Sequence, residues 1–361
     1  MFSFNFCGCR FLSVRPVSIK FPSTFVRIET KRPFSLGLST LSRLKGSHGR
    51  ISLRDKSFNY QTKRLPQSKS TTRSAVVPVS GVRNFSRIFL RCGLFTFFSI
   101  NTVFAGTMIW SYENWKSYTS RYQKGELRKL LRNSFTSIVG RPPKSTDIFW
   151  AIAFVNLVVF LGNNSRRVGT TFLRYFANSP FGPWPATSMV LSIFSHQMFF
   201  HMFINMYVLH NFTQPLVRLL GMEQFFAVFL GGGIFASFLS VLAKAIMRSP
   251  IPSIGASGAV CAALGTFCML EPQAQLCVPL LVNIMPHSFS AGSTCWAILA
   301  FEACGAILLV RRSPIDHAAH LGGLLFGMYY GMEGKEVVWK HRNTIIGVWQ
   351  RFKGEKGKSN E

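Results

Sequence analysis

The chain has 361 residues, of which 48% are hydrophobic and only 15% are charged, and its formal net charge is +28. The apolar residues lie in long blocks, which excludes a soluble globular protein and predicts an all-α polytopic membrane protein. The positive charge does not predict nucleic-acid binding, because the basic residues lie in the two tails and in connecting segments and not on one folded face.

Residues 1–80 are rich in Ser and Phe and contain fifteen Lys and Arg against two acids, Glu29 and Asp55. A basic, Ser-rich and acid-poor composition is typical of an organelle transit peptide. The alternative is a basic tail that is disordered and retained. We therefore expect residues 1–80 to direct import and to contribute nothing to the fold.

This transit assignment gives a first testable prediction. Residues 1–80 fused to a soluble reporter should carry the reporter into mitochondria, because import depends on this composition and not on the remaining chain. Fluorescence microscopy with organelle markers measures the outcome. A reporter that stays in the cytosol, or that enters plastids, would contradict the prediction.

Seven apolar segments are expected to form membrane-spanning helices. The first, residues 88–110, stands apart, because a polar connecting segment at 111–146 follows it. The other six predict a compact core within residues 147–333, and a basic amphipathic tail at 334–361 suits the membrane surface. The expected bounds in the core are 148–162, 187–212, 223–247, a short helix that begins near Ser257, 291–310 and 314–331. Residues 274–286 are expected to form a connection that is extended or that dips into the membrane.

The short helix contains the stretch Ile254-Gly255-Ala256-Ser257-Gly258-Ala259. A helix of about 16 residues is roughly 24 Å long, which is less than the ~30 Å hydrocarbon thickness of a bilayer. Ser257 is thus expected below the membrane surface, where the unpaired amides of the first helical turn face a cavity that holds water. The alternative is that these small residues only allow close helix packing.

Strongly polar residues lie in two further apolar segments, where such groups are costly and indicate function. They are His196, His201 and Asn205 in segment 187–212, and His317 and His320 in segment 314–331. His201 and Asn205 are four residues apart and share one helical face. His320 shares a face with Gly323 and Gly327, which would allow close approach of a neighbouring helix.

These residue types together predict the chemistry of a serine hydrolase. A serine hydroxyl needs a base within hydrogen-bond reach to become a nucleophile, and Ser257 with His320 can supply this pair. A tetrahedral intermediate needs donors at its oxyanion, and Asn205, His201 and the Ser257 N–H can supply them. Each histidine alone could instead form an interhelical hydrogen bond, but the complete set is hard to explain by packing.

Asp316 offers a carboxylate close in sequence to His320 and could complete a triad. However, Ser313-Pro314-Ile315-Asp316 resembles a helix start, with Ser313 as the N-cap, proline at the first helical position and an acid at the third. We therefore expect Asp316 to cap the last core helix.

Three motifs, in this order, resemble those of the rhomboid intramembrane serine proteases. They are His196 through Asn205, Gly255-Ala256-Ser257-Gly258, and His320-x-x-Gly323-x-x-x-Gly327. The resemblance covers about residues 147–333. The stretch from Asp316 to Gly323, the basic amino-terminal segment and the extra span are most similar to the mitochondrial presenilin-associated rhomboid-like subgroup.

The resemblance implies a six-helix rhomboid core with one additional N-terminal transmembrane helix, located in the mitochondrial inner membrane; a plastid membrane is the alternative. It implies a Ser–His dyad with Ser257 as nucleophile, His320 as general base and acid, and His201 and Asn205 at the oxyanion. The implied partners are transmembrane protein substrates and the lipid bilayer, with no cofactor, metal or nucleic acid.

Two features depart from many bacterial relatives but are shared by the mitochondrial subgroup: Cys261 replaces a tyrosine, and residues 163–186 contain no Trp-Arg pair.

Two other functions are open. One is a catalytically inactive rhomboid-fold protein that binds or escorts membrane clients, although such relatives typically lack the serine or the histidine. The other is a metal-handling protein built on Asp316 and the histidines at 196, 201, 317 and 320. Zinc needs three or four converging ligands, and the catalytic interpretation already uses two of these histidines. We therefore expect a serine-type endopeptidase.

Overall fold

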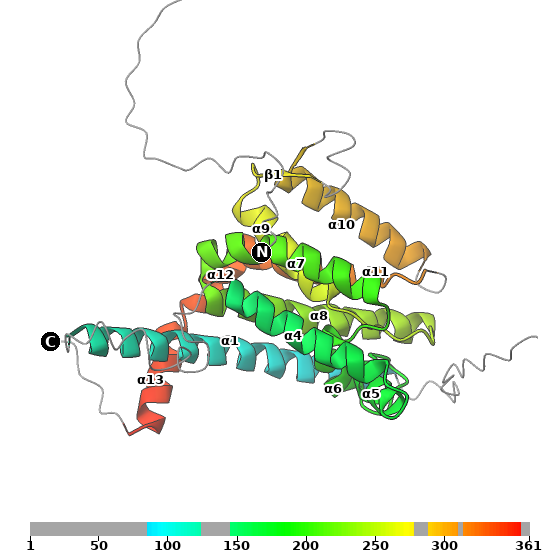
Figure 1. Cartoon of the computed structure of the whole chain (residues 1–361), viewed down its shortest axis with the longest axis horizontal. Helices are drawn as coiled ribbons and strands as arrows, with labels where there is room; N and C mark the ends of the chain where they lie inside the picture. Colours follow the sequence, from blue (N-terminus) through cyan, green and yellow to red (C-terminus); the bar gives the residue numbers. More distant parts are fainter. Residues whose placement is uncertain (1–84, 124–144, 278–287, 310–312, 355–361) are drawn as a thin grey trace, which may run out of the picture. The chain divides into compact units, whose positions relative to one another are not determined.

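The computed structural model describes residues 85–123, 145–277, 288–309 and 313–354, and these residues are mostly helical (Figure 1). The expected transit segment 1–80 and most of the connecting segment 111–146 lie outside the described residues. The division of the chain at the expected domain boundaries stays a prediction.

Long helices make up most of the described structure (Figure 1). They are α1 (Phe85–Gln123), α4 (Ser145–Asn163), α7 (Phe199–Leu220), α8 (Met222–Met247), α9 (Ser257–Leu270), α10 (Ala291–Leu308), α11 (His317–Tyr329) and α13 (Arg342–Phe352). Four of them, α1, α4, α8 and α10, are long and apolar enough to cross a membrane. These helices confirm the all-α polytopic class, whereas the number of helices that cross the bilayer stays a prediction.

Short elements connect the long helices. They are the helices α5 (Gly169–Phe176), α6 (Pro185–Leu191) and α12 (Lys335–Trp339), the 3₁₀-helix η1 (Ser192–Phe194), the π-helix η2 (Tyr330–Gly334), and the strands β1 (Gln275–Leu276) and β2 (Phe289–Ser290). The two strands pair antiparallel just before α10. The expected extended connection after α9 therefore begins as a strand, and its residues 278–287 lie outside the described residues.

Helix α9 packs against α8 and α11, and glycines of α11 bring its backbone close to that of α9. A Cβ atom on Gly323 would lie 2.0 Å from the Gly258 carbonyl oxygen, and one on Gly327 would lie 2.0 Å from that of Ala262. Neither approach is sterically possible, so only glycine fits these positions of α11. The predicted close packing of the glycine face of α11 is confirmed, and its partner is α9.

The expected continuous helix over residues 187–212 is wrong. Helical structure stops at Phe194, residues 195–198 are not helical, and α7 begins at Phe199. The side-chain amide of Asn163, at the end of α4, donates to Ser195 Oγ at 2.8 Å and to the His196 carbonyl at 3.2 Å. The Asn163 amide thus provides hydrogen bonds to groups that have no partner within a helix. These bonds offset the cost of a buried break between two helices.

The carboxyl-terminal tail forms α12 and α13, and α13 packs against α1. The Trp349 indole N–H donates to Glu113 Oε1 at 2.7 Å, and Lys353 Nζ lies 2.8 Å from the same oxygen. These bonds connect the tail to the helix that precedes the core. The location of the tail at the membrane surface stays a prediction.

Candidate functional site

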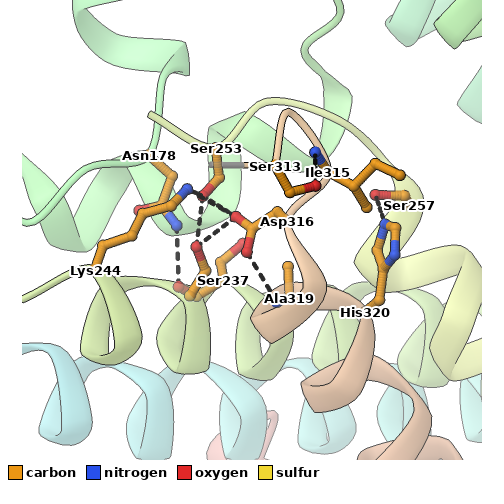
Figure 2. Close-up of polar contacts among 11 residues, drawn as sticks. Asn178, Ser237, Lys244, Ser253, Ser257, Ser313, Ile315, Asp316, Ala319 and His320 are labelled. Atoms are coloured by element: carbon orange, nitrogen blue, oxygen red, sulfur yellow. Dashed lines mark hydrogen bonds and ion pairs between the residues drawn. The ribbon is translucent and has the colours of Figure 1, made fainter. Parts of the chain in front are cut away.

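The Ser257 hydroxyl and the His320 imidazole meet where α9 contacts α11 (Figure 2). The distance between Ser257 Oγ and His320 Nε2 is 2.8 Å, and both residues are half-buried. Ser257 is the first residue of α9, and His320 lies in the first turn of α11. The glycine contacts between the two helices therefore set the geometry of this pair.

Backbone N–H groups of the segment that leads into Ser257 donate hydrogen bonds to other parts of the chain. The Ser253 N–H donates to the Asn178 carbonyl at 2.8 Å, the Gly255 N–H donates to the Ser192 carbonyl at 3.2 Å, and the Ala256 N–H donates to His196 Nε2 at 3.4 Å. His196 is fully buried. Its observed contact is thus with the backbone beside Ser257.

Gly255 brings His201 close to the serine. Its φ angle is +142°, a conformation that L side chains rarely adopt. A Cβ atom at this position would lie 2.8 Å from His201 Cε1 and 3.8 Å from Ser257 Oγ. His201 and Ser257 therefore border the same small space, and only glycine leaves this space open.

The expected oxyanion donors differ in whether their N–H groups are already hydrogen-bonded. The amides of the first turn of α9, including that of Ser257, have no intrahelical acceptor and lie at the positive end of the helix dipole. Asn205 is buried in α7, and its Nδ2 donates to the His201 carbonyl at 2.8 Å. In this structure its amide is therefore bonded within its own helix, and its role at an oxyanion stays a prediction.

A small cavity opens beside Ser257. Its lining includes the polar residues Ser192, Ser237, Ser253 and Asp316, and it is large enough for a water molecule. The expected combination of a buried helix start and a polar cavity is present at this point.

Asp316 caps α11 and is bonded away from His320 (Figure 2). Its Oδ1 accepts the Ala319 N–H at 3.1 Å, and its Oδ2 lies 2.8 Å from Lys244 Nζ and also accepts from Ser240 and Ser253. The predicted capping role is confirmed. The predicted helix start at Ser313 is wrong, because the carboxylate of Asp316 itself is the N-cap and α11 begins at His317.

Glu302 of α10 contacts His320 and was not expected at this site. Its Oε1 lies 2.9 Å from His320 Nδ1, and its Oε2 lies 2.6 Å from Nδ1 of His317. The signal was present in the sequence, since an acidic residue in the middle of the apolar segment 291–310 is costly and indicates function. The same argument applies to Lys244, which lies near the end of segment 223–247.

Within the described ranges, no group of three or more His, Cys, Asp or Glu side chains is placed to hold a metal ion. The hypothesis of a metal-handling protein therefore lacks a ligand cluster in this part of the chain.

The fold and the site define a class of helical membrane proteins. In this class, a serine at the start of one helix is hydrogen-bonded to a histidine of a helix that packs against it. Residues 183–334 match the family model of the rhomboid domain. The chain belongs to the rhomboid family, as its resemblance predicted. Within it, the chain is similar to the mitochondrial presenilin-associated rhomboid-like proteins of Rattus norvegicus (33% identical, covering 74% of this chain and 72% of the relative) and Homo sapiens (33%, covering 69% and 68%).

A similarity over a shorter stretch is to the mitochondrial rhomboid protein 1 of Saccharomyces cerevisiae, 36% identical over 44% of this chain and 45% of the relative. These relatives are all named as mitochondrial proteins, which confirms the predicted mitochondrial localisation over the plastid alternative. Family membership supports an intramembrane protease role, and the apolar helices fit a lipid bilayer.

Proposed function

We propose that the protein is an intramembrane serine endopeptidase that cleaves transmembrane protein substrates through Ser257 and His320. The observation that carries this proposal is the 2.8 Å contact between Ser257 Oγ and His320 Nε2 at a half-buried helix start. A serine bonded in this way to an imidazole has the base that it needs to attack a carbonyl carbon.

The reaction follows from these positions. His320 Nε2 takes the proton of the Ser257 hydroxyl as Oγ attacks the scissile carbonyl, and later gives this proton to the leaving amine. The Ser257 N–H stabilises the oxyanion of the tetrahedral intermediate, with His201 and Asn205 as further donors. Water then hydrolyses the acyl-enzyme, and the polar cavity beside Ser257 is large enough to hold a water molecule close to the ester.

The substrate class follows from the membrane setting of the site. The helices that carry Ser257 and His320 pack against α8 and α10, which are long and apolar enough to cross a membrane. The proposed substrates are therefore segments that are themselves embedded in the bilayer. A peptide bond in a helix is shielded by its own hydrogen bonds. Cleavage therefore requires a helix that opens locally, which small and helix-weakening residues favour.

The second candidate is a rhomboid-fold protein that binds or escorts membrane clients without cleaving them. Such a protein has no use for an activated serine. The contact between Ser257 and His320 argues for catalysis, because a binding surface alone does not require a half-buried hydroxyl to be bonded to a base.

A cleavage assay separates these functions. Detergent-purified protein should cleave a model transmembrane substrate equally well with and without a chelator, and a fluorophosphonate probe should label its serine. Ser257→Ala should lose both activities, while the matched control Ser293→Ala, at an exposed serine of α10, should keep both. Cleavage by Ser257→Ala would refute the proposal, and loss of wild-type cleavage with chelator would indicate a metal site.

A further inference from the structure

The carboxylate of Glu302 is shared between two histidines of the neighbouring helix. One oxygen is 2.9 Å from His320 Nδ1, and the other is 2.6 Å from His317 Nδ1. Only 8% of the Glu302 side chain is exposed. Ser257, His320 and Glu302 therefore form a continuous chain of hydrogen bonds across three helices, α9, α11 and α10.

We propose that Glu302 is the positioning residue of the Ser–His dyad, a third group that acts on the reaction only through His320. The inference rests on the proposed function. A carboxylate only accepts hydrogen bonds, so the atom that faces it, His320 Nδ1, must carry a proton. In the neutral imidazole the other nitrogen, Nε2, then has the free lone pair that accepts the proton of Ser257.

Glu302 also acts on the charge that develops during the reaction. His320 becomes an imidazolium when it takes the serine proton, and a carboxylate at 2.9 Å stabilises this cation. The stabilisation is stronger in a buried site than in water, because the local dielectric constant is lower. Both effects lower the barrier without any contact between Glu302 and the substrate.

The hydrogen bonds of the nearby carboxylates show why Glu302 and not Asp316 can position His320. Asp316 is the other carboxylate near His320, but its oxygens are bonded to Ala319, Lys244, Ser240 and Ser253. Among the described residues, Glu302 is thus the carboxylate that contacts the base. A purely structural link between α10 and α11 could be made by apolar residues, which avoid the cost of taking a carboxylate out of water.

His317 keeps the carboxylate in this orientation. Its Nδ1 occupies the second oxygen, and its ring lies against Gly305, where a Cβ atom would come within 2.5 Å of it. The missing side chain at Gly305 thus makes room for a buried histidine that binds the carboxylate oxygen not bonded to His320. A carboxylate held at both oxygens cannot rotate away from the base.

The test is Glu302→Gln, which keeps the side-chain shape. The new amide can donate to His320 Nδ1 and so favour the tautomer that cannot accept the serine proton, for which a comparable change in a triad costs about 10⁴-fold in kcat. We expect kcat to fall between about 100-fold and 10⁴-fold with KM nearly unchanged, and Glu302→Asp to recover part of the loss. Glu333→Gln, at an exposed glutamate, is the matched control and should keep wild-type kinetics.

A spectroscopic measurement separates positioning from a structural role. Protons shared between imidazole Nδ1 and a carboxylate give strongly downfield ¹H NMR signals, so the ¹⁵N-histidine-labelled wild type should show one for His317 and one for His320. The signal that His320→Ala removes is the one that reports the bond between Glu302 and the base. This measurement decides the matter even if Glu302→Gln does not fold. Absence of this signal, wild-type kcat in Glu302→Gln, or a loss of activity that its melting temperature fully explains would overturn the inference. Absence of cleavage by the wild type would instead refute the proposed function.

Discussion

Ser257→Ala and His320→Ala should each abolish cleavage, and the double variant should be no less active than either single variant. The two side chains share one hydrogen bond of 2.8 Å, and the proposed mechanism uses both in one proton transfer. A serine without its base is a poor nucleophile, and a base without its serine has no proton to remove. In a hydrolase whose residues act as such a unit, the loss is on the order of 10⁶-fold in kcat for one substitution or for several together.

Single-turnover cleavage of a transmembrane substrate, with folding checked by thermal melting, measures this comparison. Asn205→Ala should be milder, at about 100-fold to 1,000-fold, because the proposed mechanism then loses one oxyanion donor and keeps the others. Additive losses in the double variant would contradict the shared mechanism. So would a defect in Asn205→Ala that equals the defect in Ser257→Ala.

The contact between α9 and α11 could be predicted from sequence because it depends on local pattern. Glycines three and seven residues after a histidine indicate a helix face with no side chains. Such a face allows another helix to pack closely against it in a membrane. A serine at the start of a short apolar helix indicates a buried amide-rich turn. Both signals are contained in a few neighbouring residues, so neither requires knowledge of the rest of the fold.

The break before α7 could not be predicted in this way. Residues 187–212 are apolar enough for one helix, and the break is stabilised by Asn163, which is 32 residues away from Ser195 in sequence. The start of α11 also differs from the start predicted at Ser313, and for a similar reason. Asp316 is fixed by Lys244 and Ser253 from distant segments, and this network selects it over Ser313 as the N-cap.

Unlike the break before α7 and the start of α11, the position of Glu302 could be predicted in part from the sequence. Its cost at membrane depth was readable from the sequence, but its partners were not, because the sequence does not indicate which face of α10 meets α11. Only the three-dimensional arrangement shows that its carboxylate lies against Nδ1 of His320 and not against lipid.

Gly323→Ala should inactivate the protein although it changes a residue that bears no functional group. The added Cβ would lie 2.0 Å from the Gly258 carbonyl oxygen and 3.1 Å from Cys261 Cβ. Backbone atoms cannot yield locally, so α11 must move away from α9. This movement lengthens the distance between Ser257 and His320, which lie on these two helices.

Misplacement of a catalytic group by ~1 Å can cost ~100-fold in rate, so we expect at least this loss for Gly323→Ala and a larger one for Gly323→Leu. Cleavage and fluorophosphonate labelling should fall together, since both require the activated serine, while carbonate extraction should show that the protein is still inserted. Gly106→Ala in α1 is the matched control, because a Cβ there meets nothing within 4 Å. Full activity in Gly323→Ala would mean that the separation of α9 and α11 does not set the geometry of the Ser–His pair, and the site would then need another constraint to hold Ser257 against its base.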